Sequence, residues 1–480
     1  MKYLIKNATL VNEGIEHVAS VLIEDDCIAQ IIDEQLSLER NLANEETARQ
    51  VESEDTMVID ATGMLLMPGV IDDHVHMRDP GLTHKADMDS ETRAAAAGGV
   101  TSVMDMPNVV PQTTTLELWQ QKMDYASQHC HVNYAMYLGA TNDNLEEIKR
   151  MDTTRIPALK LFMGSSTGGM LVDKEEQLRT IFAECPTLIM THCEDTDRIN
   201  ERMAEAKQKD ADPAIELHPW IRDDEACYRS SALAVRLAKE TGARLHIAHI
   251  TTAKELELLE QPVPQPDTLP LQGAGHLPQG KTQGLGRNLS AEVCPQHLFF
   301  TDEDYKRLGS LIKCNPAIKS KKDRDALRQA ILDGKISVIG TDHAPHLLDE
   351  KQGGAAKAVS GMPLVQFSLP LMLTLSDKGI LPRTLLVELM CHNPARLFGI
   401  EKRGFIRPGF KADLVLIKKE TWTIQESDIL SKCGWSPLTG ESMTWKVART
   451  WCNGHLVFDG KEVDNTYLGE PLRFNSLNSL

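Results

Sequence analysis

Two histidines separated by one residue are the first feature of this sequence that could carry out chemistry. They end the segment 68–76, which reads PGVIDDHVH. Side chains at positions i and i+2 of a β-strand point to the same face, so the imidazoles of His74 and His76 could bind one cation. Such a pair is also compatible with two polar residues at a strand end, and a metal site needs further ligands.

Two more histidines follow apolar runs elsewhere in the chain. His192 follows the run 188–190, and His249 follows the run 245–248. His246 and His249 are an odd number of positions apart, so on one strand they face opposite ways. We therefore expect His249, nearer the end of the strand, to join the other histidines, and His246 to be a partly buried, hydrogen-bonded ring.

A lysine and an aspartate occupy comparable places. Lys160 lies in the apolar run ALKLFM, where a buried ammonium is costly unless it is compensated. A strand position open to solvent is one explanation, and a neutral or carbamylated lysine, whose carbamate could bridge two cations, is the other. Asp342 follows the apolar run 338–340 and Thr341, and could bind metal, move a proton or cap the next helix.

The elements around these residues alternate between short β-rich runs and longer helical stretches from about residue 68 to about 400, which is typical of βα units around a parallel sheet. In a (β/α)₈ barrel, catalytic groups come from the C-terminal ends of several strands, where these residues lie. We predict an α/β fold with a TIM-like barrel over 67–402. The candidate strands are 99–104, 133–138, 158–162, 187–190, 244–248, 290–293 and 336–339.

Both ends of the chain differ from this middle part. Short apolar runs separated by turn residues predict that 1–66 and 403–480 together form one small β-sandwich. The acidic segment 36–56 is interpreted as an excursion from it, and the segment 261–289, rich in Pro, Gln and Gly, as a surface insertion. Residues 349–360 are interpreted as a solvent loop, with a lid as the alternative.

Composition narrows the class of protein. The net charge of −18, from 69 acidic and 51 basic residues among 480, disfavours nucleic acid as a partner but permits an anionic small molecule at a local cationic site. No apolar run of about 18 residues predicts a membrane span. Ten scattered cysteines without a C-x-x-C pair, and a start without a signal-like apolar run, favour a reduced cytoplasmic protein.

The combination of these residues resembles the ligand set of the amidohydrolase superfamily, in which zinc ions lie at the mouth of a barrel. The resemblance covers nearly the whole chain. It implies two Zn²⁺ ions bridged by N6-carboxylysine at Lys160. One ion would be bound by His74, His76 and Asp342 and the other by His192 and His249.

Within that superfamily, shorter motifs resemble the dihydroorotase family. They are HMRDPG at 76–81, MPN at 106–108, CNP at 314–316, DHAPH at 342–346 and SKCGWSP at 431–437. The resemblance implies that Arg78, Asn108 and His346 hold a substrate carboxylate, and that Asn315 and the backbone at 361–363 contact the ring. An Arg fork suits a carboxylate, because two parallel N–H groups match its two oxygens.

The implied reaction is the reversible cyclisation of N-carbamoyl-L-aspartate to L-dihydroorotate in pyrimidine synthesis, with Asp342 moving the proton. Other cyclic amidohydrolases, namely a dihydropyrimidinase, a hydantoinase or an allantoinase, remain alternatives, as does an inactive partner of aspartate transcarbamoylase. A homodimer and an association with that transferase are left open. Gln296 stands where many relatives have His, which bears on loop geometry rather than on the six proposed ligands.

Overall fold

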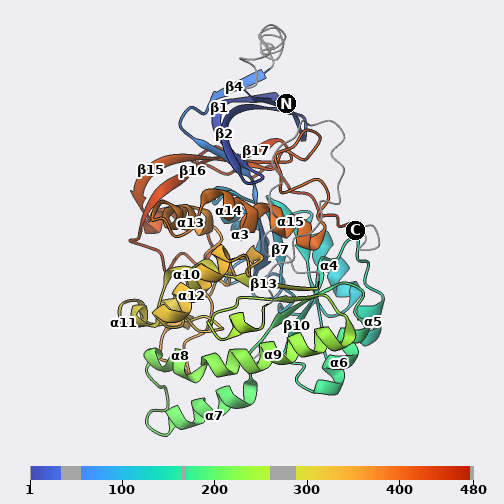
Figure 1. The fold of residues 1–480 in the computed structure, drawn as a ribbon, viewed down its shortest axis with the longest axis vertical. Helices are drawn as coiled ribbons and strands as arrows, with labels where there is room; N and C mark the ends of the chain where they lie inside the picture. Colours follow the sequence, from blue (N-terminus) through green and yellow to red (C-terminus); the bar gives the residue numbers. More distant parts are fainter. Residues whose placement is uncertain (1, 34–55, 165–168, 260–287, 476–480) are drawn as a thin grey trace.

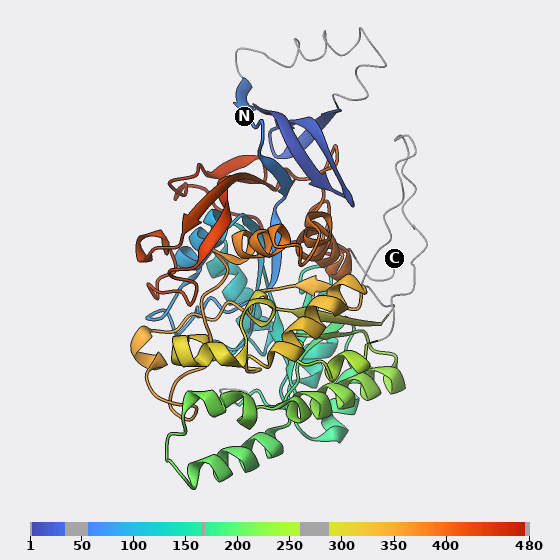
Figure 2. The ribbon, with the colours of Figure 1, turned by 60° about the vertical axis from the view of Figure 1, so that its left-hand side comes forward.

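The computed structural model describes residues 2–33, 56–164, 169–259 and 288–475. It consists of a parallel barrel with helices around it and a separate sheet above one end of the barrel (Figures 1 and 2). The predicted excursion at 36–56 and the predicted insertion at 261–289 fall almost entirely outside the described residues.

The barrel contains eight strand positions, the third of which is divided into two short strands. Their bounds are β6 Val70–Val75, β7 Val100–Asp105, β8 Asn133–Met136 with β9 Leu138–Gly139, β10 Ala158–Phe162, β11 Leu188–His192, β12 Leu245–Ile247, β13 Leu289–Val293 and β14 Val338–Ile339. Each of the seven predicted strands overlaps one of them, and the predicted fold class is confirmed.

Hydrogen bonds join these strands into a closed ring. One set pairs β6, β7 and β8, and the other runs from β9 through β10, β11, β12 and β13 to β14. A parallel bridge between Val75 and His343, with His76 N donating to the His343 carbonyl at 2.7 Å, joins the first strand to the end of the last. The C-terminal ends of distant strands therefore meet at one mouth.

Helices follow the strands and cover the outside of the barrel. They are α3 Met88–Ala97, α4 Leu116–Ala126, α5 Leu145–Lys149, α6 Glu175–Glu184, α7 Thr196–Lys207, α8 His218–Ile221, α9 Asp224–Thr241, α10 Pro295–Phe299, α11 Tyr305–Leu308, α12 Lys321–Leu332, α13 Ser368–Asp377, α14 Arg383–Val387 and α15 Asn393–Phe398.

Helix α9 illustrates how local sequence sets these bounds. The Asp223 side chain accepts a hydrogen bond from Ala226 N and caps the first turn. At the other end Gly242 adopts a left-handed conformation, with φ of 78°, which ends the helix. Between the caps, one face is buried against the barrel, including Ala234 and Leu237.

Strands from both ends of the chain form one separate sheet, where the sequence predicted a small β-sandwich assembled from both ends. Its members are β1 Lys2–Asn12, β2 Ile15–Glu24, β3 Cys27–Asp33, β4 Thr56–Asp60, β5 Leu65–Pro68, β15 Leu414–Thr423, β16 Ser442–Cys452 and β17 His455–Phe458. The hydrogen-bonded order is β17-β16-β15-β5-β1-β2-β3, with β4 also paired to β1.

This sheet bends over its own core. Tyr3 on β1 and Trp451 on β16 are three strand positions apart, yet their rings meet edge to face with centroids 6.0 Å apart. Both side chains are buried in one apolar cluster with residues of β2 and β15. We retain 1–66, 67–402 and 403–480 as the proposed domain limits.

A buried polar junction connects the sheet to the barrel. Arg403 donates to Asp413 at 2.5 Å and to Asn453 at 2.6 Å, and Asp413 also accepts from Asn133 Nδ2 at 3.2 Å. Asn133 begins barrel strand β8, whereas Asp413 directly precedes sheet strand β15. The paired charges lie at 5% and 3% exposure, so they are compensated by each other rather than by water.

The segment 349–360 is neither a plain solvent loop nor a detached lid, and the prediction is corrected here. Lys351 is fully buried, and its ammonium donates to the carbonyls of Lys313, Val359 and Gly361 at 3.1, 2.8 and 2.7 Å. All three N–H donors of Lys351 therefore have acceptors, which offsets the free-energy cost of burying this group and holds the segment in place. Ala355 is buried as well.

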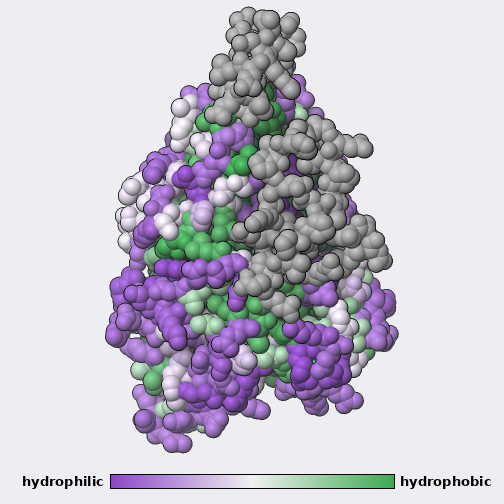
Figure 3. Space-filling model, in the orientation of Figure 1, coloured by the Kyte–Doolittle hydropathy of each residue, from purple (hydrophilic) through white to green (hydrophobic). Residues whose placement is uncertain are grey.

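The surface, the helices and the cysteines of the described residues agree with what the composition predicts. The face in Figure 3 is mostly hydrophilic over the lower helices, and hydrophobic residues gather toward the middle of the molecule. Among the described helices, none is long and apolar enough to cross a membrane. All ten cysteines are free thiols.

We expect the substitution Arg403→Met to lower the free energy of unfolding by about 3–5 kcal/mol, because it leaves the Asp413 carboxylate buried without its counterion. Arg236→Met is the control, since Arg236 pairs with Glu175 and Glu240 at the surface and should contribute less than about 1 kcal/mol. Urea unfolding measures both. Equal unfolding midpoints for the two variants would contradict a stabilising junction.

Candidate metal centre

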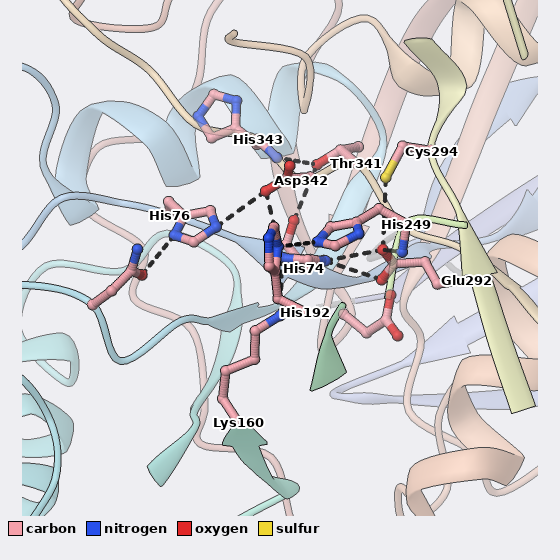
Figure 4. A network of polar contacts seen from close by, with 12 residues as sticks. His74, His76, Lys160, His192, His249, Glu292, Cys294, Thr341, Asp342 and His343 are labelled. Atoms are coloured by element: carbon pink, nitrogen blue, oxygen red, sulfur yellow. Dashed lines mark hydrogen bonds and ion pairs between the residues drawn. The ribbon is translucent and has the colours of Figure 1, made fainter. Parts of the chain in front are cut away.

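The structure brings all six predicted ligands to the mouth of the barrel. His74 lies in β6 and Lys160 in β10, and His192 ends β11. His76, His249 and Asp342 follow the ends of β6, β12 and β14. Figure 4 shows His74 in the middle, with His76 and Asp342 on one side, His249 on the other, and Lys160 reaching toward it from below.

The first group of donors consists of His74, His76 and Asp342. Their ligating atoms all lie within 4.8 Å of one another. Asp342 Oδ1 is 3.1 Å from His76 Nε2 and 3.4 Å from His74 Nε2. Two imidazole nitrogens and one carboxylate oxygen form a donor set that suits a divalent ion such as zinc.

The second group consists of His192 and His249. His192 Nε2 lies 3.1 Å from Glu194 Oε2, so the ring proton belongs on Nε2 and the Nδ1 lone pair is free. That Nδ1 faces His249 Nε2 at 2.9 Å. The four histidine rings are contiguous, because the centroids of His74 and His249 are 5.3 Å apart. Two neighbouring metal positions therefore fit the mouth.

Lys160 is fully buried between the groups, so a solvent-exposed strand position is excluded. Its Nζ lies 3.5 Å from His74 Nε2. Burial lowers the pKa of Lys160, and an unprotonated amine can add CO₂. An ammonium at this point would repel a cation held by His74, whereas a carbamate oxygen would be a ligand, so the residue fits the bridging role.

Three site residues have strained backbones. Arg78, His249 and Asp342 have φ of 65°, 39° and 49°, in the left-handed region that residues with a Cβ rarely adopt. Such strain persists where surrounding structure imposes it, and it clusters at functional sites. For His249 it has a direct consequence: β12 ends at Ile247, and the turn of the chain, rather than strand alternation, aims this ring at the mouth.

His246 is the buried, hydrogen-bonded ring that the sequence predicted. It is fully buried, and its Nδ1 lies 2.8 Å from Ser290 Oγ. Gln296, which departs from the pattern of many relatives, is also buried and donates to the Thr341 carbonyl at 3.1 Å. It therefore supports the chain just before Asp342.

Two carboxylates that sequence reasoning missed hold the histidine ligands. Glu292 Oε1 lies 2.9 Å from His74 Nδ1, and Glu194 Oε2 contacts His192 as described above. Burial alone would raise the pKa of Glu194, but Arg222 and His192 lower it to about 2. A charged residue inside an apolar strand is the sequence signal that could have identified Glu292. Such carboxylates fix the tautomer and orientation of a ligand.

The predicted substrate residues are partly brought together. Arg78 Nη2 lies 2.8 Å from His346 Nε2, and Asn108 Oδ1 lies 2.8 Å from His76 Nδ1, so these three residues border the metal donors. Asn315 Oδ1 is buried without a hydrogen-bond partner. No direct hydrogen bond joins Asn315 to the other three among the described residues. Lys85, which the sequence did not single out, lies 3.2 Å from His346 Nδ1.

The backbone at 361–363 packs against this region. A Cβ added to Gly361, whose φ is 132°, would lie 2.6 Å from the Ala344 carbonyl and 2.9 Å from His346 Cδ2. Only glycine allows this approach. The segment therefore borders His346, where the resemblance placed a ring contact.

The comparisons with known proteins agree with this geometry. The sequence profile of the Amidohydrolase family matches residues 65–457. The chain belongs to this family. Like other amidohydrolases it presents His and Asp groups that could bind metal.

Among relatives of this amidohydrolase, the dihydroorotase of Methanosarcina mazei is 33% identical over 396 residues, which cover 81% of this chain and 82% of that protein. The L-hydantoinase of Paenarthrobacter aurescens is 30% identical over 476 residues, which cover 96% and 95%. A solved L-hydantoinase (dihydropyrimidinase) from Arthrobacter aurescens has a TM-score of 0.85 at 27% identity and covers 98% of this chain and 99% of its own.

We expect Glu194→Gln to weaken zinc binding by about 10- to 100-fold, because the substitution removes the anionic acceptor that orients His192. Competition with a chromogenic chelator measures the affinity. Glu255→Gln is the matched control: Glu255 is equally buried, but its side chain bonds Ser231 and Thr252 instead of a proposed ligand. Unchanged zinc affinity in Glu194→Gln would contradict the orienting role.

Proposed function

We propose that this amidohydrolase is a zinc-dependent dihydroorotase, which interconverts N-carbamoyl-L-aspartate and L-dihydroorotate in pyrimidine synthesis. One observation carries the proposal: the buried guanidinium of Arg78, which contacts His346, lies beside the metal donors His76 and Asp342. A substrate matching this arrangement has a cyclic amide and a carboxylate on the same small ring. L-Dihydroorotate has both.

The group formed by Arg78, His346 and Lys85 suits an anion. Arg78 stays charged, and its Nη2 and the Lys85 ammonium face the two nitrogens of His346. Burial and the neighbouring Arg78 and Lys85 hold the pKa of His346 far below its usual range, so the ring is neutral. A neutral ring has one N–H and cannot accept from both cations at once. A bound carboxylate would satisfy the remaining donors.

The donor set supports the metal assignment. His74, His76 and Asp342 would hold one Zn²⁺ ion, His192 and His249 the other, and carbamylated Lys160 would bridge them. When bound there, zinc would supply Lewis-acid chemistry, since it lowers the pKa of a nucleophilic water and polarises an amide carbonyl.

Asp342 is placed to move the proton. Burial raises the pKa of its carboxyl, but the neighbouring His74 and His76 outweigh this effect and hold the pKa well below its usual range. The carboxylate is therefore ionised near neutral pH and can act as a base. In hydrolysis it would take the proton of the attacking water and deliver it to the leaving ring nitrogen, and in cyclisation the transfer runs in reverse.

The two asparagines would orient the substrate. Asn108 Oδ1 accepts from His76 Nδ1, which leaves its amide N–H groups free to donate to a carboxylate oxygen. Asn315 Oδ1 is a buried acceptor without a protein partner and suits a ring N–H. Together with Arg78 and His346 they would fix the ring amide over the metal donors.

A hydantoinase or dihydropyrimidinase is the second candidate, because relatives with those names match nearly the whole chain. Hydantoin and dihydrouracil are cyclic amides without a carboxylate. They would leave the buried Arg78 guanidinium without an anionic partner. The binding of such a substrate would therefore be weaker.

The test is a comparison of substrates with zinc-loaded enzyme. We expect kcat/KM for dihydroorotate to exceed that for dihydrouracil, hydantoin and allantoin, and a chelator to abolish turnover until zinc is restored. Preference for a ring without a carboxylate would replace the proposal by the second candidate. No turnover of any of these rings at full zinc occupancy would indicate a non-catalytic relative.

The Arg78→Met variant tests whether Arg78 binds the substrate carboxylate. We expect kcat/KM for dihydroorotate to fall by about 30- to 1,000-fold, equivalent to about 2–4 kcal/mol for a lost charge-assisted bidentate contact, with much less effect on any residual dihydrouracil turnover. Arg179→Met, at an exposed ion pair with Glu240 on the outer helix α6, is the control. Equal losses for both substrates would indicate a structural rather than a carboxylate-binding role.

A further inference from the structure

A second group of possible ligands lies deeper in the barrel than the mouth. It consists of Asp73 on β6, His246 on β12 and Glu292 on β13. One donor atom of each lies within 4.8 Å of the other two, and all three side chains are fully buried. His246 also packs edge to face against Phe398, which belongs to the apolar cluster inside the barrel.

Several atoms of this inner cluster have no hydrogen-bond partner. They are Asp73 Oδ1, Asp73 Oδ2 and His246 Nε2. Nδ1 of His246 lies 2.8 Å from Ser290 Oγ, and the Ser290 hydroxyl in turn donates to the Leu245 carbonyl at 3.4 Å, which favours a proton on Nδ1. Nδ1 is then the donor, and the lone pair of Nε2 points toward the carboxylates.

The spacing of these atoms suits ligands of one ion better than a hydrogen bond. His246 Nε2 lies 3.6 Å from Asp73 Oδ2, whereas a normal N–H···O contact is about 2.7–3.2 Å. Two ligand atoms each about 2.1 Å from one tetrahedral ion lie about 3.4 Å apart.

The barrel is shaped so that the two carboxylates can converge. A Cβ added to Gly340, next to β14, would lie 2.5 Å from Asp73 Oδ1 and 2.7 Å from Glu292 Oε2. Any side chain at this position would therefore displace both. Glu292 Oε1 accepts from His74 Nδ1 and from His249 N, each at 2.9 Å, whereas Oε2 lies 3.2 Å from His74 Nδ1 and, with Asp73 Oδ1, lines the space beside Gly340.

The charges of the inner cluster require a positive partner. Two carboxylates buried side by side are strongly unfavourable unless a cation or a proton lies between them. Lys160 is the nearby basic side chain, and carbamylation would make it an anion. One nitrogen and two carboxylate oxygens are donors that Zn²⁺ and similar divalent ions accept.

We propose that Asp73, His246 and Glu292 bind a third divalent transition-metal ion of the Zn²⁺ class inside the barrel, beneath the catalytic donors. The ion neutralises the two carboxylates. Because Glu292 also accepts from His74, the inner ion would fix the residue that orients a catalytic ligand. This inference does not depend on which cyclic amide the enzyme uses.

The test is anomalous diffraction at the zinc edge from crystals of the full chain grown with excess Zn²⁺, combined with metal analysis of the dissolved protein. We expect a peak between Asp73, His246 and Glu292 in addition to those at the mouth, and three zinc ions per chain. Asp73→Asn and His246→Asn should each remove the inner peak and reduce the ratio to two.

Asp72→Asn is the matched control. Asp72 is a neighbouring buried carboxylate, but its oxygens accept from Thr341 N, Thr341 Oγ1 and His74 N, so it is not an inner ligand. This variant should keep the inner peak. Since turnover is not the readout, the result is separate from the test of dihydroorotase activity.

Zinc at the mouth without an inner peak in the wild-type protein would overturn the proposal, and an Asp73–His246 contact shortened to hydrogen-bond length would assign the position to a proton. An inner peak that survives in both Asp73→Asn and His246→Asn would overturn it as well. If those variants fail to fold, the wild-type crystal decides the question alone.

Discussion

Polar side chains are buried against one another at the mouth of the barrel. The need to compensate them there explains the rest of the site. Four imidazoles, one lysine and one aspartate are all buried there against one another. In a medium of low dielectric, unpaired charges and lone pairs directed at each other are costly. A cation is a partner that the imidazoles and the carboxylate have in common, so their arrangement has a physical basis as a metal centre.

The fold sustains this arrangement from several directions. Parallel strands deliver the donors to one end, and strained backbone at His249 and Asp342 aims two of them where a regular strand would not. Glu292 and Glu194 hold the rings of His74 and His192 from behind. The sheet built from both ends of the chain is in turn joined to the barrel through Arg403, Asp413 and Asn133.

Specificity within such a fold depends on what borders the donors. Proteins named dihydroorotase and L-hydantoinase match this chain to similar extents, so overall likeness does not choose between their substrates. The buried Arg78 provides a local criterion, because its guanidinium suits a substrate that carries a carboxylate. Lys351 contributes indirectly by fixing the segment that packs against His346.

The sequence by itself determined the barrel and much of its chemistry. Strand positions follow from apolar runs, and polar residues within or after those runs stand out as candidates, whereas the set of six ligands follows from the resemblance to the amidohydrolase superfamily. These are local patterns, so they are visible without tertiary contacts. The same reasoning correctly expected His249, and not His246, to face the mouth. In the structure the turn after β12 directs His249 there, rather than strand alternation.

Only the tertiary structure decided the partners that come from distant segments. Glu292 reaches His74 across 218 positions of the chain, and Gly340 matters because two carboxylates from other strands approach it. The segment 349–360 has the composition of a solvent loop, yet its Lys351 is fully buried and donates to the carbonyls of Lys313, Val359 and Gly361. No local pattern encodes such contacts, because their energies depend on which groups the closed barrel places within a few ångströms of each other.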